Sequence, residues 1–153
     1  FMIIENALIS DLEEILALQK LAYLSEAEIC NDFSIPPLLQ TIEDIKSEYA
    51  YKTFLKAVDS GKIIGSVRAN LQDGTCYIGK LIVHPDYQNR GIGTALMNSI
   101  ENCFKGCKRY DLFTGKKSVK NIYLYNKLGY RIFKEEKISE KLTLVSLEKI
   151  AAN

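Results

Sequence analysis

A polar, glycine-containing loop stands between an apolar run and a helical pattern in the middle of the chain. The apolar run ends at His84, and the loop rises to "RGIG", residues 90–93. From Ile92 to Cys103, apolar residues recur at helical spacing. The first amides of a helix lack internal partners, and glycines let a ligand approach the backbone closely. The stretch therefore predicts an anion site, with a plain glycine-rich helix start as the purely structural alternative.

Two other phosphate-binding motifs fit this loop less well. The glycines are not followed by lysine and a hydroxyl residue, which excludes the loop of nucleoside triphosphatases. A dinucleotide fingerprint needs a third glycine where this chain has Leu96, although Asp111 lies at a suitable distance for a ribose-binding acid. A dinucleotide-binding oxidoreductase is therefore kept as a weaker alternative.

The order of predicted elements indicates an α+β fold. Turn residues separate the apolar runs 53–58, 62–71 and 75–84, which predicts antiparallel hairpins. Leu81-Ile82-Val83 is apolar throughout, which predicts a central strand with both faces buried. Ser10 to Glu13 reads as a capping box. The other expected elements are strands at 2–7, 110–114, 130–138 and 141–148, a helix at 10–22 continued by a second piece at 25–31, and helices at 41–49, 92–103 and 118–127.

Composition limits the partners. A chain of 153 residues, 47% hydrophobic and 25% charged, predicts one globular domain over residues 2–150, with Phe1 before Met2 taken as an expression remnant. The net charge of +1 provides no broad basic field, so neither nucleic acid nor a membrane surface is expected as a partner. No apolar run is long enough to span a bilayer, and no leader opens the chain.

The cysteines indicate thiols rather than a disulfide framework. Without a leader, a reducing cytoplasm is the expected location. His84 is the only histidine, and the pair Cys103 and Cys107 would need two further ligands to hold zinc, so no metal site is predicted.

Two stretches resemble the signatures of one enzyme family. "LIVHPDYQNRGIGTALM", residues 81–97, resembles the acetyl-CoA-binding signature of the GCN5-related N-acetyltransferases (GNAT), whose loop reads Gln/Arg-x-x-Gly-x-Gly/Ala. Gln88, Gly91 and Gly93 match that loop. "LYNKLGY", residues 124–130, resembles the second signature. The element order also matches, so the resemblance covers nearly the whole chain and implies a GNAT-like sheet of about seven strands flanked by about four helices.

The resemblance implies an N-acetyltransferase with acetyl-CoA as its co-substrate and no metal. The main chain of a strand would bind the pantetheine arm, and a strand amide near Leu81 or Ile82 would hold the oxyanion. Tyr125 would be the general acid that protonates the departing thiolate, unless it belongs to an aromatic stripe with Tyr123 and Tyr130. The expected cofactor-binding residues are Leu81, Ile82, Val83, Gln88, Asn89, Arg90, Gly91, Ile92, Gly93, Thr94 and Asn121.

The chain departs from the family pattern at two places. Where many relatives have an asparagine seven residues before the tyrosine, this chain has Ser118, and Asn121 is the candidate to take over the cofactor contact. Where relatives often carry a glutamate before the apolar triad, this chain has Gly79. The general base is therefore left open among the carboxylates of the early helical region, Glu26, Glu28 and Asp32.

The acceptor is expected to be a small-molecule amine or a peptide N-terminus, attacked directly in a ternary complex. Acidic residues at 26–48 favour a cationic amine, if they line the cleft. A non-catalytic acyl-CoA sensor is the alternative from a different functional class, since the glutamate is missing. A monomer and a homodimer are both left open.

Overall fold

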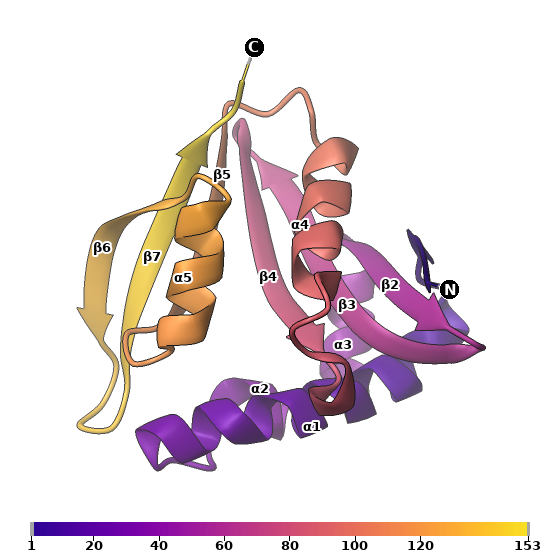
Figure 1. Ribbon diagram of the computed structural model, residues 1–153, viewed down its shortest axis with the longest axis horizontal. Coiled ribbons are helices and arrows are strands. Elements are labelled where there is room, and N and C mark those ends of the chain that lie inside the picture. The colour runs from indigo at the N-terminus through magenta and orange to yellow at the C-terminus, as the bar shows by residue number, and fades with distance from the viewer. Residues whose placement is uncertain (1, 153) are drawn as a thin grey trace.

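The computed structural model describes residues 2–152, so Phe1 lies outside the described residues. Its centre is a seven-stranded sheet in the order β1-β2-β3-β4-β5-β7-β6 (Figure 1). The strands are β1 (Met2–Asn6), β2 (Thr53–Asp59), β3 (Lys62–Gln72), β4 (Thr75–Val83), β5 (Arg109–Gly115), β6 (Arg131–Lys137) and β7 (Thr143–Ile150). The helices are α1 (Leu12–Cys30), α2 (Pro36–Leu39), α3 (Ile42–Tyr49), α4 (Ile92–Cys103) and α5 (Val119–Lys127), with short 3₁₀ turns at Ile9–Asp11 and Pro85–Tyr87.

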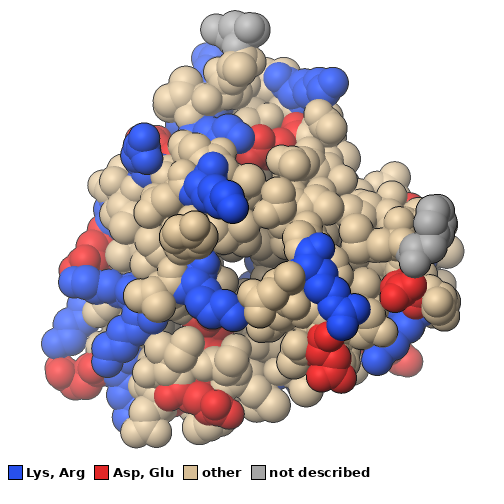
Figure 2. Space-filling view, viewed as in Figure 1, with Lys and Arg blue, Asp and Glu red and all other residues tan. Residues whose placement is uncertain are grey.

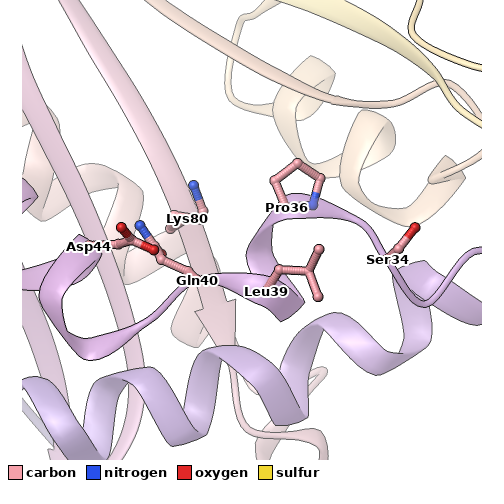
Figure 3. A pocket seen from close by; sticks show the side chains of 6 residues that line it. All are labelled: Ser34, Pro36, Leu39, Gln40, Asp44 and Lys80. Atoms are coloured by element: carbon pink, nitrogen blue, oxygen red, sulfur yellow. The ribbon is translucent and has the colours of Figure 1, made fainter.

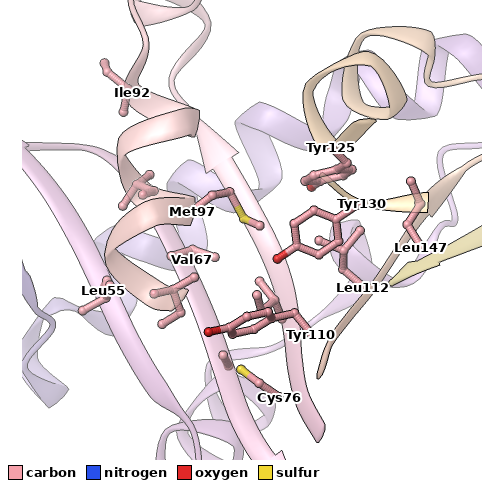
Figure 4. Close-up of a cluster of buried hydrophobic side chains, with 14 of the residues drawn as sticks. Leu55, Val67, Cys76, Ile92, Met97, Tyr110, Leu112, Tyr125, Tyr130 and Leu147 are labelled. Atoms are coloured by element: carbon pink, nitrogen blue, oxygen red, sulfur yellow. The ribbon is translucent and has the colours of Figure 1, made fainter. Parts of the chain in front are cut away.

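Helices cover the sheet from both sides. Ile15 of α1 and Ile45 of α3 are fully buried against Phe54 of β2 on one face. On the opposite face, α4 and α5 pack on a larger core, in which Met97 lies near Tyr125 of α5 and near Tyr130, which follows that helix (Figure 4). The apolar stripes in the sequence are therefore the inner faces of these helices.

The two halves of the sheet are joined by a short parallel contact. Only Thr75, Cys76 and Tyr77 of β4 pair with β5, while β4 runs on to Val83 and β5 to Gly115. Beyond Tyr77 the two strands diverge (Figure 1). Residues 78–83 of β4 therefore have a strand partner, β3, on one side only.

A bulge interrupts β4 within residues 78–83, which have β3 as their strand partner. Ser66 of β3 pairs with Ile82 and Arg68 pairs with Gly79, so that two residues of β4, Lys80 and Leu81, stand opposite one residue of β3. Lys80 adopts a left-handed backbone with φ of 51°. Bulges of this kind re-aim side chains and main-chain groups next to functional sites.

The predicted fold class is confirmed: the sheet has seven strands and is antiparallel at every junction except β4–β5. The described residues contain five α-helices where about four were expected, because Pro36–Leu39 forms a short turn of its own. The segment 25–31 is not a separate piece, since α1 runs unbroken to Cys30.

Two finer predictions are wrong. Ser10 does not cap α1; a 3₁₀ turn precedes the helix, and the Asp11 carboxylate accepts from the Leu8 amide at 2.7 Å. The triad at the end of β4 is fully buried only at Ile82, whereas Leu81 and Val83 are half-buried. Their side chains pack on the core beside α4, and β5, which has turned away, does not complete their burial.

Candidate active site

The N-terminus of α4 offers unpaired amides beside the end of β4. Gly91 is the N-cap with a left-handed φ of 79°, and its carbonyl accepts the first helical bond from Ala95 at 3.0 Å. The amides of Ile92, Gly93 and Thr94 precede that bond and have no helical acceptor. They carry the positive end of the helix dipole, which favours an anion here.

The approach to these amides is open. A Cβ built on Gly91 would meet no atom within 4 Å, and Gly91 and its neighbours Asn89 and Arg90 are exposed. Asn89 has a left-handed φ of 62°, Gln88 is exposed, and the Arg90 guanidinium lies 5.2 Å from the centre of the Tyr87 ring. Lys and Arg side chains surround a hollow between α4 and α5 on this face (Figure 2). Local charge can therefore attract a phosphate although the net charge is small.

The start of α4 lies directly against β4 and α5. A Cβ on Gly93 would be 3.5 Å from Leu124, 3.9 Å from Leu81 and 4.0 Å from Val83, which are ordinary contacts. The side chains of Leu81 and Val83 thus pack toward α4, while their main chain forms the strand edge that β5 leaves unpaired. The predicted phosphate site and the predicted pantetheine-binding strand are adjacent in space.

Tyr125 projects from α5 into the same region. It is 7% exposed, and its ring centre is 6.0 Å from that of Tyr130 (Figure 4). Its hydroxyl has no hydrogen-bond partner within residues 2–152. Burial raises the pKa of Tyr125 above its usual range, and Tyr23 and Glu26 raise it further. The phenol is therefore protonated at neutral pH and available as a donor.

The two candidates for the contact to the cofactor arm, Ser118 and Asn121, both bind a carboxylate of α1. Ser118 Oγ donates a short hydrogen bond to Glu26, and Asn121 Nδ2 donates to Glu26 at 3.1 Å and to Thr114 at 3.2 Å. The Ser118 side chain does not cap its own helix. Glu26 thereby ties α1 to α5 across the open side of the sheet, a contact that the helical pattern alone could not predict.

The other early carboxylates are largely engaged elsewhere. Glu28 is exposed, Asp32 accepts from the amide and hydroxyl of Ser34, and Asp44 accepts from the Thr41 amide at 2.9 Å. Glu48 forms ion pairs with Lys52 and Arg68. Of the three candidate bases, only Glu26 acts electrostatically on Tyr125.

Sequence reasoning missed a buried polar cluster between β3 and the helices α1 and α3. Arg68 is 1% exposed, with Nη1 3.2 Å from Glu48 Oε2 and Nη2 donating to Gln19 Oε1 at 2.6 Å. Its guanidinium carbon lies 4.5 Å from the centre of the Phe54 ring. An arginine in the otherwise small and apolar stretch "IIGSVRANL" was the available signal, because a buried charge needs partners.

Comparison with known proteins agrees with this geometry. The profile of the Acetyltransferase (GNAT) family matches residues 12–130, from the start of α1 to the end of the second signature. The chain belongs to the GNAT family. The predicted recognition is confirmed, and the mostly antiparallel sheet argues against a dinucleotide-binding βαβ unit; Asp111 itself is bound to Arg109 at 2.8 Å.

Curated relatives are similar over part of their own length. The chain is 29% identical over 131 residues to the UPF0157 protein YqkA of Bacillus subtilis, which covers 86% of this chain and 38% of that protein. It is 32% identical over 84 residues to an acetyltransferase of Sodalis glossinidius, covering 52% of this chain and 57% of that protein. The chain thus spans well under two thirds of these relatives.

Solved structures share the fold over nearly the whole chain. The ribosomal-protein-S18-alanine N-acetyltransferase of Escherichia coli superposes with a TM-score of 0.83 at 15% identity, covering 100% of this chain and 96% of that one. The PaiA N-acetyltransferase of Thermoplasma acidophilum, solved with coenzyme A, gives 0.72 at 21% identity, covering 98% and 99%. In the part of this chain that the structure describes, no helix is long and apolar enough to cross a membrane, and no group of three metal-ligating side chains occurs.

Proposed function

We propose that this GNAT chain transfers the acetyl group of acetyl-CoA to a primary amine by direct attack in a ternary complex. The observation that carries the proposal is the junction of an unpaired β4 edge, the open N-terminus of α4 and a free tyrosine hydroxyl. Each part matches one chemical group of acetyl-CoA: an amide-rich arm, a pyrophosphate and a sulfur.

The residues present fit such a co-substrate. The unpaired main chain of Leu81 to Val83 would pair with the pantetheine arm as a strand would. The amides of residues 89–94 would hold the pyrophosphate, with Gln88 and Arg90 at the rim. The bulge at Lys80 turns main-chain groups out of the strand pattern, so that an amide near Leu81 can stabilise the oxyanion.

Tyr125 would complete the reaction. As the amine nitrogen bonds to the carbonyl carbon, the carbon–sulfur bond breaks and the thiolate takes a proton from the phenol. Glu26 is the best-placed carboxylate to receive the proton lost by the amine, because it lies close enough to influence Tyr125. This role would give a use to a tyrosine that is largely buried as a residue but whose hydroxyl makes no hydrogen bond within residues 2–152.

A thermal-shift experiment tests the co-substrate without knowledge of the acceptor. We expect acetyl-CoA, and neither NAD(H) nor NADP(H), to raise the melting temperature, and Gly91→Glu to abolish the shift. That substitution places a negative charge where the pyrophosphate should lie. Gly74→Glu is the matched control: Gly74 has a similar φ of 82° but lies in the turn at the opposite end of β4. An equal shift in a folded Gly91→Glu protein would remove the phosphate site.

The non-catalytic sensor is the second candidate, favoured by Gly79 at the place of the family glutamate. Release of free thiol from acetyl-CoA in the presence of a panel of amines separates the two functions, since a sensor releases none. We keep a small-molecule amine or peptide N-terminus as the acceptor class. Cytoplasmic location and homodimer formation stay predictions, to be measured by fractionation and by light scattering.

A further inference from the structure

Gly79 leaves an open space next to a buried cation. Gly79 pairs in register with Arg68, so that a side chain at Gly79 would share the face on which Arg68 lies. A Cβ built on Gly79 would meet no atom within 4 Å. The chain therefore offers room, and positive charge, beside Gly79.

Positive charge exceeds negative charge around this space. Arg68 and Lys52 share the single carboxylate of Glu48, at 3.2 Å and 2.9 Å. The Arg68 Nε is buried without a hydrogen-bond partner in the part of the chain that the structure describes. Lys80 is half-buried, and within residues 2–152 its ammonium makes neither a hydrogen bond nor an ion pair. A buried cation without a partner is costly unless an anion joins it.

The Lys80 side chain lines a cavity large enough for a small-molecule ligand. The cavity has a volume of about 380 Å³ and lies between β4 and the segment that contains α2 (Figure 3). Ligand pockets commonly begin at about 300 Å³. The one carboxylate on its wall, Asp44, accepts from the Thr41 amide as part of the α3 cap. The lining residues are Ser34, Pro36, Leu39, Gln40, Asp44 and Lys80.

The surroundings of Lys80 disfavour its charged form. Burial lowers the pKa of Lys80, and the nearby charges of Arg68 and Lys52 lower it further, while Glu48 acts in the opposite direction. A bound carboxylate would reverse this balance and hold the lysine in its charged form.

We propose that the acceptor is an amine that also carries a carboxylate, and that Lys80 binds this carboxylate in the space beside Gly79, with the charge of Arg68 behind it. The inference rests on the proposed N-acetyltransferase activity and names its substrate class as an amino acid. It differs from the cationic acceptor expected from the sequence. Of the acidic residues behind that expectation, Asp44 is engaged in a helix cap and Glu48 in ion pairs. Glu26, which binds Asn121 of α5, stays the carboxylate proposed to receive the proton of the amine.

The test compares L-amino acids with their carboxamides and their decarboxylated amines. Rates are expressed as kcat/KM for the neutral amine, so that differences in the protonated fraction of the amines do not enter. We expect the carboxylate member of at least one set to be preferred by tenfold or more. We expect Lys80→Gln to remove that preference mainly by raising KM, and Lys80→Arg to retain part of it. Lys46→Gln, which removes an exposed charge from α3, is the control and should leave the preference intact.

Gly79→Glu provides a second, independent variant. Its backbone φ is not left-handed and the position is open, so that the side chain fits without strain. It should raise KM for the amino acids, because its carboxylate takes the place of theirs, and spare the carboxylate-free amines.

Four results would overturn the inference. These are equal use of the carboxamides, no turnover of any carboxylate-bearing amine, a loss of kcat in Lys80→Gln that is the same for all three classes, and improved use of amino acids by Gly79→Glu. A common loss of kcat would assign Lys80 to proton removal instead. An acetyl-CoA thermal shift is measured on the same samples: its presence in such a case leaves the proposed function standing, and its absence removes both proposals.

Discussion

The hydroxyl of Tyr125 gives the sharpest test of the proposed chemistry. Tyr125→Phe removes one oxygen and leaves the ring, which packs 6.0 Å from Tyr130 in the core. Because the hydroxyl has no hydrogen-bond partner in residues 2–152, its removal breaks no bond of the folded protein. We therefore expect the free energy of unfolding to change by no more than about 0.5 kcal/mol, as for substitutions that disturb no structural feature.

The expected effect on catalysis is much larger. Positioned general acids contribute about 10²- to 10⁴-fold to rate, which corresponds to roughly 3–5 kcal/mol of transition-state stabilisation. The proton is needed as the thiolate leaves, so the loss should fall on kcat, with the affinity for acetyl-CoA nearly unchanged. Burial keeps the pKa of Tyr125 raised, so the same phenol is protonated across the neutral range and its own ionisation should not shape the activity profile there.

The assay is thiol release at saturating acetyl-CoA and acceptor, paired with acetyl-CoA titration by thermal shift. Tyr123→Phe is the matched control, since Tyr123 lies on the same helix but is 69% exposed. Equal kcat in Tyr125→Phe and wild type would refute the acid role and return Tyr125 to the aromatic core. A parallel loss of acetyl-CoA binding would mean that the hydroxyl holds the co-substrate rather than donating a proton.

Two further predictions concern thiols and acid stability. Cys103 is exposed, whereas burial, with a smaller effect of Cys107, raises the pKa of Cys76 to about 12. A thiol reagent at pH 8 should therefore modify Cys103 first and Cys76 only after unfolding. Rapid modification of both thiols in mass spectra would contradict the burial of Cys76. Burial raises the pKa of Asp11, but the hydrogen bond from Lys56 at 2.7 Å outweighs it, so the pKa is lowered overall. The contact therefore stabilises the fold above about pH 3.8 and is lost as the pH falls through the lowered pKa. Asp11→Asn should therefore cost on the order of 1 kcal/mol at pH 7 in denaturant unfolding, with the gap to wild type closing toward pH 3, and a pH-independent gap would contradict the assignment.

The sequence predicted those parts of the fold that depend on local pattern. Helical spacing from Ile92 and the glycines before it located α4 and its open N-terminus, because periodicity and φ above zero are local properties. Hairpin turns predicted the antiparallel strands. The divergence of β4 from β5 after Tyr77 had no local signal in the residues, since parallel pairing joins strands that lie far apart in sequence.

The polar contacts of the site were the least predictable part. Glu26 and Ser118 are 92 residues apart, and their bond depends on how α1 crosses the sheet. Arg68 was missed because its partners Glu48 and Gln19 come from two different helices. Whether the acidic residues of the 26–48 segment line the cleft could not be predicted, because the helix cap of Asp44 and the ion pairs of Glu48 form only in the folded chain.

The divergence of β4 and β5 also bears on the lifetime of the protein. On the proposed function, acetyl-CoA supplies the missing neighbour of a central strand, so that the ligand completes the sheet as well as the active site. A ligand at about 100 times its Kd adds roughly 2.7 kcal/mol to the free energy of unfolding. Without its co-substrate, residues 78–83 of β4 keep a strand partner on one side only, which would favour local opening and proteolysis there. Its abundance in a cell would then follow the supply of acetyl groups.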